Sequence, residues 1–238
     1  MHYDSLVIAA HADDAETQMG GTLAKLADRG QRILLVDLTV GEPTEFGEPG
    51  VRALQAAEAA RILGVERVSL GGQDRLLSDG LEVRLEVARL IRAHRPRWVY
   101  GTGEASTHPD HAAAVTITRA AVFEARLGQW DRVPGGERLA GQEPWLVERL
   151  FFPHCKMEAP WGEFAFAVDV SPVYERKRQA LAAYQSIFRA EGDPLLALYE
   201  AEDQYYGRLL GVAYAEVFRS ASPLLVDDPT LFLPGVHA

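Results

Sequence analysis

Short apolar runs alternate with amphipathic segments through the first half of the chain. This alternation is typical of strand, crossover helix and parallel strand. We predict buried strands over the apolar runs, and helices where apolar residues recur at helical spacing. Gly30 and Gly64 directly follow two of these helices, as expected for a left-handed helix end. The predicted strands are 6–10, 32–40, 67–70 and 97–100, and the predicted helices are 21–28, 51–63, 81–91 and one that begins near Pro109.

The second half of the chain is less regular. From about Val147, two apolar segments are separated by a connection that contains Pro and Gly rather than by a helical segment. The tail over 223–236 carries three prolines, which is a poor composition for a central strand. The segment over 128–144 is the least regular, and we expect a mobile loop there, near the functional site. The apolar segments span 147–152 and 163–170, and further helices are predicted over 172–189 and 194–210.

These patterns predict an α/β fold with a doubly wound, mostly parallel sheet and a less regular C-terminal extension. A chain of 238 residues, 47% of them hydrophobic, can bury one sizeable core. We therefore expect a single domain over 1–238. Within it, 1–127 would carry the functional motifs and 128–238 would complete the substrate pocket.

Charge and cysteine content exclude several classes of function. The formal net charge of −10 argues against binding to nucleic acid or anionic lipid, because either partner requires a basic face. Cys155 is the only cysteine, so no intrachain disulfide can form and a reducing compartment suits the chain. No basic segment precedes the first apolar run, and no stretch approaches the ~18 apolar residues of a membrane span. We expect a soluble cytoplasmic protein that binds neither nucleic acid nor membrane.

Two motifs rich in His and Asp follow predicted strands. The sequence HADD occupies 11–14, directly after the first strand, and HPDH occupies 108–111, beyond the strand over 97–100. Open α/β sheets bind ligands outside the carboxyl ends of their strands, so both motifs are expected at one crevice. This combination of imidazoles and carboxylates is what a catalytic divalent-metal site requires.

The spacing within the motifs assigns roles. His11 and Asp14 lie three residues apart on a tight turn and can converge on one ion, and His111 would complete a set of three ligands. Two His and one carboxylate with an open position is the ligand count of a catalytic zinc site, although iron(II) accepts the same ligands. Bound water then becomes the nucleophile, and Asp13, beside the ligand Asp14, is placed to act as its general base.

The remaining residues of HPDH are assigned to the substrate side of the site. His108 would stabilise the oxyanion of a tetrahedral intermediate and protonate the departing amine, with Asp110 orienting the ring and raising its pKa. Structural explanations compete with these roles, because Asp commonly caps helices and an isolated His commonly packs in a core. Two such motifs on the same side of one sheet favour the metal site.

Other features carry weaker signals. Gly20 and Gly21 lack the spacing of a phosphate-binding loop, so we expect a packing role. Cys155 beside a single His is expected to be inert. Glu216 is a candidate residue of the substrate cleft.

The chain resembles the LmbE-like (PIG-L) N-acetylglucosaminyl deacetylases, whose signatures are A-H-P-D-D-x-E-x-x-x-G-G and H-P-D-H. It has AHADDAETQMGG at 10–21 and HPDH at 108–111. The likeness runs nearly end to end and looks closest to the bacillithiol-pathway branch, which deacetylates N-acetylglucosaminyl malate. Further matching segments are DLTVGE (37–42), ARILG (60–64), VERLFF (147–152) and YYGRLLGVAYAEVF (205–218).

The resemblance implies a Rossmann-like fold and a site with the same residues. It implies zinc on His11, Asp14 and His111, Asp13 as the base, and a pair formed by His108 and Asp110 on the oxyanion side. It also implies a small amino-sugar substrate and a homo-oligomer, often a hexamer.

Two departures from the family pattern bear on these expectations. Ala12 replaces the signature proline but removes no ligand, so metal binding should survive. Thr107 precedes HPDH where the bacillithiol branch commonly has Arg, which would suit a malate carboxylate. Its absence weakens the malate assignment, and Arg52, Arg75 or Lys156 are the candidate replacement cations.

The sequence therefore predicts a zinc-dependent hydrolase that removes the N-acetyl group from an N-acetylglucosamine-type conjugate, with N-acetylglucosaminyl malate as one candidate. Two alternatives stay open. The protein could be an amidase for another small N-acyl compound, since the catalytic residues do not encode the leaving group. It could also bind metal and sugar without catalysis.

Overall fold

One seven-stranded sheet organises the protein. The computed structural model describes residues 1–44, 46, 48, 50–103, 107–155, 163–189 and 192–225. The strand order is β3-β2-β1-β4-β5-β7-β6; the first five strands in this order run parallel, whereas β7 pairs antiparallel with both β5 and β6. The strands are β1 (Ser5–Ala9), β2 (Ile33–Thr39), β3 (Glu66–Gly72), β4 (Trp98–Tyr100), β5 (Arg149–Pro153), β6 (Phe166–Asp169) and β7 (Ala215–Ser220).

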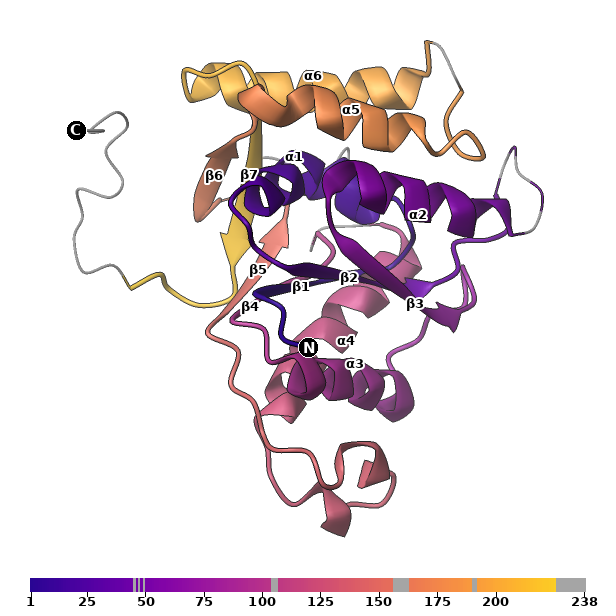
Figure 1. Ribbon diagram of the computed structural model, residues 1–238, viewed down its shortest axis with the longest axis vertical. Coiled ribbons are helices and arrows are strands. Elements are labelled where there is room, and N and C mark those ends of the chain that lie inside the picture. Colours follow the sequence, from indigo (N-terminus) through magenta and orange to yellow (C-terminus); the bar gives the residue numbers. More distant parts are fainter. Residues whose placement is uncertain are drawn as a thin grey trace.

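Helices cover both faces of the sheet, as predicted for a doubly wound fold. Helices α3 and α4 lie on one face and α1 and α2 on the other, and α5 and α6 form an outer layer over α1 and α2 (Figure 1). The helices are α1 (Asp14–Asp28), α2 (Val51–Leu63), α3 (Leu81–His94), α4 (Pro109–Ala125), α5 (Tyr174–Ala182) and α6 (Pro194–Leu209).

Side chains of the central strand alternate between two hydrophobic clusters. Leu6 and Ile8 of β1 pack with residues of α3 and α4, while Val7 and Ala9 pack with residues of α1, α2 and α5. All four side chains are buried. Because both faces of this parallel strand are covered, the sequence shows an unbroken apolar run instead of an alternating one.

Helix α1 begins at Asp14, well before the predicted start at Gly21. The first turn of this helix is mostly polar, so the spacing of apolar residues did not predict its start. Met19 has non-helical dihedral angles (φ −147°, ψ 22°), so the helix consists of two segments. A Cβ atom on Gly21 would lie 2.6 Å from Cβ of Val170, which confirms that this glycine permits close packing.

The second half of the structure differs from the expected pattern in three places. Strand β7, which pairs with both β5 and β6, was not predicted. The predicted loop over 128–144 contains two short 3₁₀ helices, Trp130–Arg132 and Gly136–Leu139. The second of these contacts α3, and the segment projects away from the sheet (Figure 1). Helix α5 is shorter than the predicted 172–189.

Most of the proline-containing tail, 226–238, lies outside the described residues. Within the described part of the chain, no helix combines the length and apolarity needed to cross a membrane.

Candidate metal centre

The two predicted motifs meet at the carboxyl ends of β1 and β4. His11 follows β1, and its backbone N–H donates to Oδ2 of Asp14 at 2.8 Å, which closes the turn into α1. His108 is the N-cap of α4 and accepts a hydrogen bond from the Asp110 backbone at 3.2 Å. Pro109 follows at the start of the helix, where no amide donor is needed. These local features place His11, Asp14 and His111 together.

The side chains of three residues converge at the ligand spacing of a tetrahedral ion. Nδ1 of His11 lies 3.3 Å from Nε2 of His111 and 3.5 Å from Oδ2 of Asp14, and Nε2 of His111 lies 3.1 Å from Oδ1 of Asp14. Two ligands that are each about 2.0 to 2.1 Å from a tetrahedral zinc are roughly 3.3 Å apart. These three residues therefore fit a divalent ion of this size.

The charges of the trio favour a cation. Burial lowers the pKa of His11, but the hydrogen bond and charge of Asp14 and the charge of Asp13 outweigh it and raise the pKa to about 9. Burial is likewise outweighed at His111, where Asp14 raises the pKa to about 11. Burial raises the pKa of Asp14, but His111 and His11 together hold it well below its usual range. A divalent ion would take the place of these protons.

Carboxylates hold the other side of the His11 ring. Its Nε2 lies 3.0 Å from Oδ2 of Asp110 and 3.1 Å from Oδ1 of Asp74. The Asp110 carboxylate also accepts from the backbone N–H groups of Arg75 at 2.6 Å and Leu77 at 3.2 Å. Such a carboxylate commonly orients a metal-binding imidazole so that its opposite nitrogen faces the ion.

This placement differs from the expected pairing of Asp110 with His108. The Asp110 carboxylate lies 3.0 Å from Nε2 of His11, while its backbone N–H donates to Nδ1 of His108. Burial and the charges of His11 and His111 lower the pKa of His108, and Asp110 and Asp74 only partly offset them. The HPDH motif predicted that Asp110 lies near the site. The spacing within the motif does not show which imidazole the carboxylate faces.

Asp13 forms an ion pair with Arg52 beside the trio. Nη2 of Arg52 lies 2.6 Å from Oδ1 of Asp13, and its Nε donates to the carbonyl oxygen of Ala12 at 3.2 Å. Gly41 makes room for the guanidinium, because a Cβ atom there would lie 2.6 Å from Nε of Arg52. Burial raises the pKa of Asp13, and the Arg52 charge partly opposes this effect.

The trio, Asp13 and Arg52 line a cavity of about 250 Å³. The cavity contains every predicted catalytic or metal-binding residue except Asp110, which lies behind His11. Two of the lining residues, Asp74 and Tyr199, were not predicted. Asp74 lies in a loop without a recognisable sequence period, and Tyr199 lies on the outer helix α6. The lining residues are His11, Asp13, Asp14, Thr17, Gln18, Arg52, Asp74, His108, His111, Cys155 and Tyr199.

Glu216 lies elsewhere and has a structural environment. It is fully buried on β7, where Lys177 donates to it at 2.7 Å. The backbone N–H groups of Gly21 and Thr22 also donate to its carboxylate, at 2.9 and 2.7 Å. The structure therefore does not bring this candidate substrate contact to the cavity.

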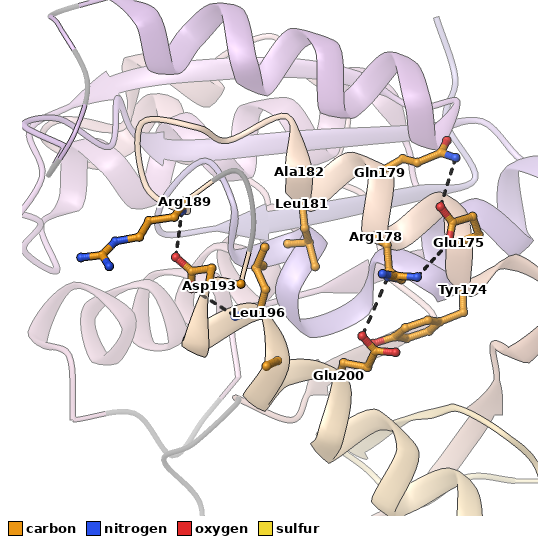
Figure 2. Close-up of a pocket in the computed structure, with 12 residues that line it drawn as sticks. Tyr174, Glu175, Arg178, Gln179, Leu181, Ala182, Arg189, Asp193, Leu196 and Glu200 are labelled. Atoms are coloured by element: carbon orange, nitrogen blue, oxygen red, sulfur yellow. Dashed lines mark hydrogen bonds and ion pairs between the residues drawn. The ribbon is translucent and has the colours of Figure 1, made fainter.

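A second cavity, of about 450 Å³, lies between α5 and α6. Figure 2 shows Arg178 between the carboxylates of Glu175 and Glu200, and Asp193 accepting a hydrogen bond from the backbone of Arg189. Its charged groups pair mainly with one another, and none of the predicted catalytic residues lines it. The smaller cavity at the strand ends is therefore the candidate functional site.

The fold and this site define an α/β protein with a candidate metal centre at the carboxyl ends of its parallel strands. The PIG-L family model, described as GlcNAc-PI de-N-acetylase, matches residues 6–122. The chain is 30% identical to diacetylchitobiose deacetylase of Thermococcus kodakarensis, over 97% of this chain and 83% of that protein. The chain belongs to the PIG-L family of deacetylases.

Two further relatives extend the comparison. The chain is 26% identical to 1D-myo-inositol 2-acetamido-2-deoxy-alpha-D-glucopyranoside deacetylase of Tsukamurella paurometabola, over 98% of this chain and 93% of that protein. Among solved structures, the conserved protein TT1542 of Thermus thermophilus is 39% identical, with a TM-score of 0.82 over 94% of this chain and 97% of that chain. The similarity therefore includes the C-terminal extension.

Proposed function

We propose that the protein is a zinc-dependent hydrolase that removes the acetyl group from an N-acetylglucosamine-type conjugate. The observation that carries this proposal is the convergence of His11, Asp14 and His111 beside the carboxylate of Asp13. The names of the two deacetylase relatives support the amino-sugar part of the substrate.

The residues of the site divide the reaction between them. His11, Asp14 and His111 would hold the ion, which when bound supplies Lewis-acid activation of water and of the acetamide carbonyl. Asp13, oriented by Arg52, accepts the proton of the water whose oxygen bonds to the carbonyl carbon. His108, whose pKa is lowered, stabilises the oxyanion as a neutral hydrogen-bond donor, and the proton accepted by Asp13 passes to the nitrogen as the C–N bond breaks. The products are acetate and a free amine.

The charged side chains that line the cavity favour an uncharged conjugate. Arg52 is the only Lys or Arg among the described lining residues of the cavity, and Asp13 already pairs with that side chain. Arg75 is not among these residues, and Lys156 lies outside the described residues. We therefore propose that a neutral N-acetylglucosaminide is a better substrate than N-acetylglucosaminyl malate.

Both halves of the chain contribute to the proposed catalytic unit. Cys155 and Tyr199, from the second half, line the same cavity as the two motifs of the first half. Strands from both halves also share one sheet. We propose that 1–238 acts as a single catalytic domain in which 128–238 completes the pocket.

Acetate release tests the proposal. Purified protein loaded with zinc should release acetate and a free amine from a panel of neutral N-acetylglucosaminides, and more slowly from N-acetylglucosaminyl malate. Turnover only of N-acyl compounds without a sugar would favour the broader amidase. Sugar binding without turnover at any metal loading would favour a non-catalytic binder and contradict the proposal.

A further inference from the structure

The catalytic turn is separated from the main part of α1 by an irregularity. Asp13 and Asp14 begin the first turn of this helix, and the backbone N–H of Thr17 donates to the carbonyl oxygen of Asp13 at 2.9 Å. Met19 then interrupts the helical conformation. Because the backbone departs from helical angles at this point, the rest of α1 does not by itself fix the orientation of the first turn, and side-chain contacts contribute to it.

A buried network supplies such contacts through Glu16. Oε1 of Glu16 accepts from Nη1 of Arg67 at 2.5 Å and from the hydroxyl of Tyr184 at 2.8 Å. Nη1 of Arg67 also donates to the Tyr184 hydroxyl at 2.9 Å. Arg67 is held in turn by Asp37, through contacts of 2.6 and 2.8 Å. Glu16 and Tyr184 are fully buried, so water cannot replace these bonds.

The partners come from three different parts of the fold. Asp37 lies on β2, Arg67 on β3 and Tyr184 directly after α5. Glu16 thus ties the first turn of α1 both to the sheet and to the helical layer of the second half. None of these four side chains lines the cavity.

We propose that Glu16, Arg67 and Tyr184 are positioning residues that hold Asp13 and Asp14 in place for metal binding and proton transfer. This inference rests on the proposed function. A displacement of about 1 Å at a reacting group can cost on the order of 100-fold in rate. Loss of one contact in the network therefore alters the site without removing any residue from it.

Tyr184→Phe tests the network with the smallest change. It removes one hydroxyl and leaves Arg67 paired with Glu16 and Asp37. Tyr174→Phe is a matched control, because the Tyr174 hydroxyl also donates to a buried carboxylate, that of Asp203, at 3.2 Å. Tyr174 has no contact with the first turn of α1 among its described hydrogen bonds.

The measurement is zinc affinity, by competition with a chromophoric chelator in the absence of substrate, followed by kcat and KM. We expect Tyr184→Phe to bind zinc about tenfold more weakly and to lose kcat with little change in KM, while Tyr174→Phe keeps the wild-type affinity. Thermal unfolding of both variants reports their stability separately.

Three outcomes would overturn the inference. Tyr184→Phe could keep wild-type zinc affinity and kcat, both tyrosine variants could lose affinity equally, or the wild-type protein could bind no zinc. The last outcome would also overturn the proposed metal site, whereas zinc binding without acetate release would contradict only the proposed function. If Tyr184→Phe does not fold, Glu16→Gln tests the inference instead. This substitution keeps the shape of the Glu16 side chain and should also weaken zinc binding.

Discussion

Each of the two segments of α1 is held by a buried network of charges, and the two networks differ in what they support. At the first turn, which begins at Asp14, Arg67 pairs with both Glu16 and Asp37. After the interruption at Met19, the helix restarts, and Glu216 accepts hydrogen bonds from the buried backbone N–H groups of Gly21 and Thr22. Lys177 neutralises Glu216 and Asp203, at 2.7 Å from each.

Burial and charge do not distinguish these networks. Lys177, Glu216 and Asp203 are as inaccessible as Glu16. Burial lowers the pKa of Lys177, but the charges of Asp203 and Glu216 outweigh it and raise the pKa, as for an ion pair that supports the fold. Position relative to the cavity is what separates them, because Glu16 lies in the same helical turn as Asp14, and burial and the Glu16 charge both raise the pKa of Asp13. Buried charge is thus weak evidence of function until its neighbours are known.

The largest effect is expected from removing a ligand of the site. His111→Ala should abolish stoichiometric zinc binding and acetate release, because two ligands cannot hold the ion in the remaining geometry. Elemental analysis after gel filtration checks the metal content. Full retention of zinc by this variant would show that the ion binds elsewhere.

Asp13→Asn comes next. It should lower kcat by about 10² to 10⁴, the usual contribution of a general base, while zinc remains bound. Steady-state kinetics on protein of verified zinc content measures this effect. A wild-type kcat in this variant would show that Asp13 is not the general base.

Lys177→Met tests the network that contacts the second segment of α1. It leaves Asp203 and Glu216 buried without their cation, which should lower the free energy of unfolding by about 3 to 5 kcal/mol. Urea denaturation measures this loss. The zinc affinity of the folded variant should stay within about twofold of the wild-type affinity. A large drop in zinc affinity would show that both networks support the metal site.

A smaller effect than these three is expected at Asp110, behind the ligand His11. Asp110→Asn keeps the shape of the side chain but weakens its hold on Nε2 of His11, so zinc affinity should fall by about 10- to 100-fold. Asp79→Asn is the control, since Asp79 is paired with Arg84 and is not a cavity residue. Equal losses in the two variants would contradict the role of Asp110.

Local signals in the sequence predicted the parallel half of the fold well. Helix α2 spans the predicted residues, and Gly64 ends it with a left-handed φ of 77°. Helix α4 begins at Pro109 as expected. Strands β1 and β2 were predicted because burial on both faces gives continuous apolar runs. Ligands bind outside the carboxyl ends of parallel strands, and this tendency placed the two motifs at one crevice.

The features that the sequence did not reveal depend on contacts between distant segments. β7 is held by β5 and β6, and its charged Glu216 made the segment resemble part of a cleft rather than a strand. Asp74 reaches the site only because the loop after β3 folds back on His11. The oligomeric state stays a prediction.

Anomalous X-ray diffraction at the zinc edge, on crystals equilibrated with zinc, tests the central claim most directly. The account predicts one strong peak roughly 2.0 to 2.2 Å from Nδ1 of His11, a carboxylate oxygen of Asp14 and Nε2 of His111. A peak bound by other side chains, or no peak in a protein that still releases acetate, would contradict it.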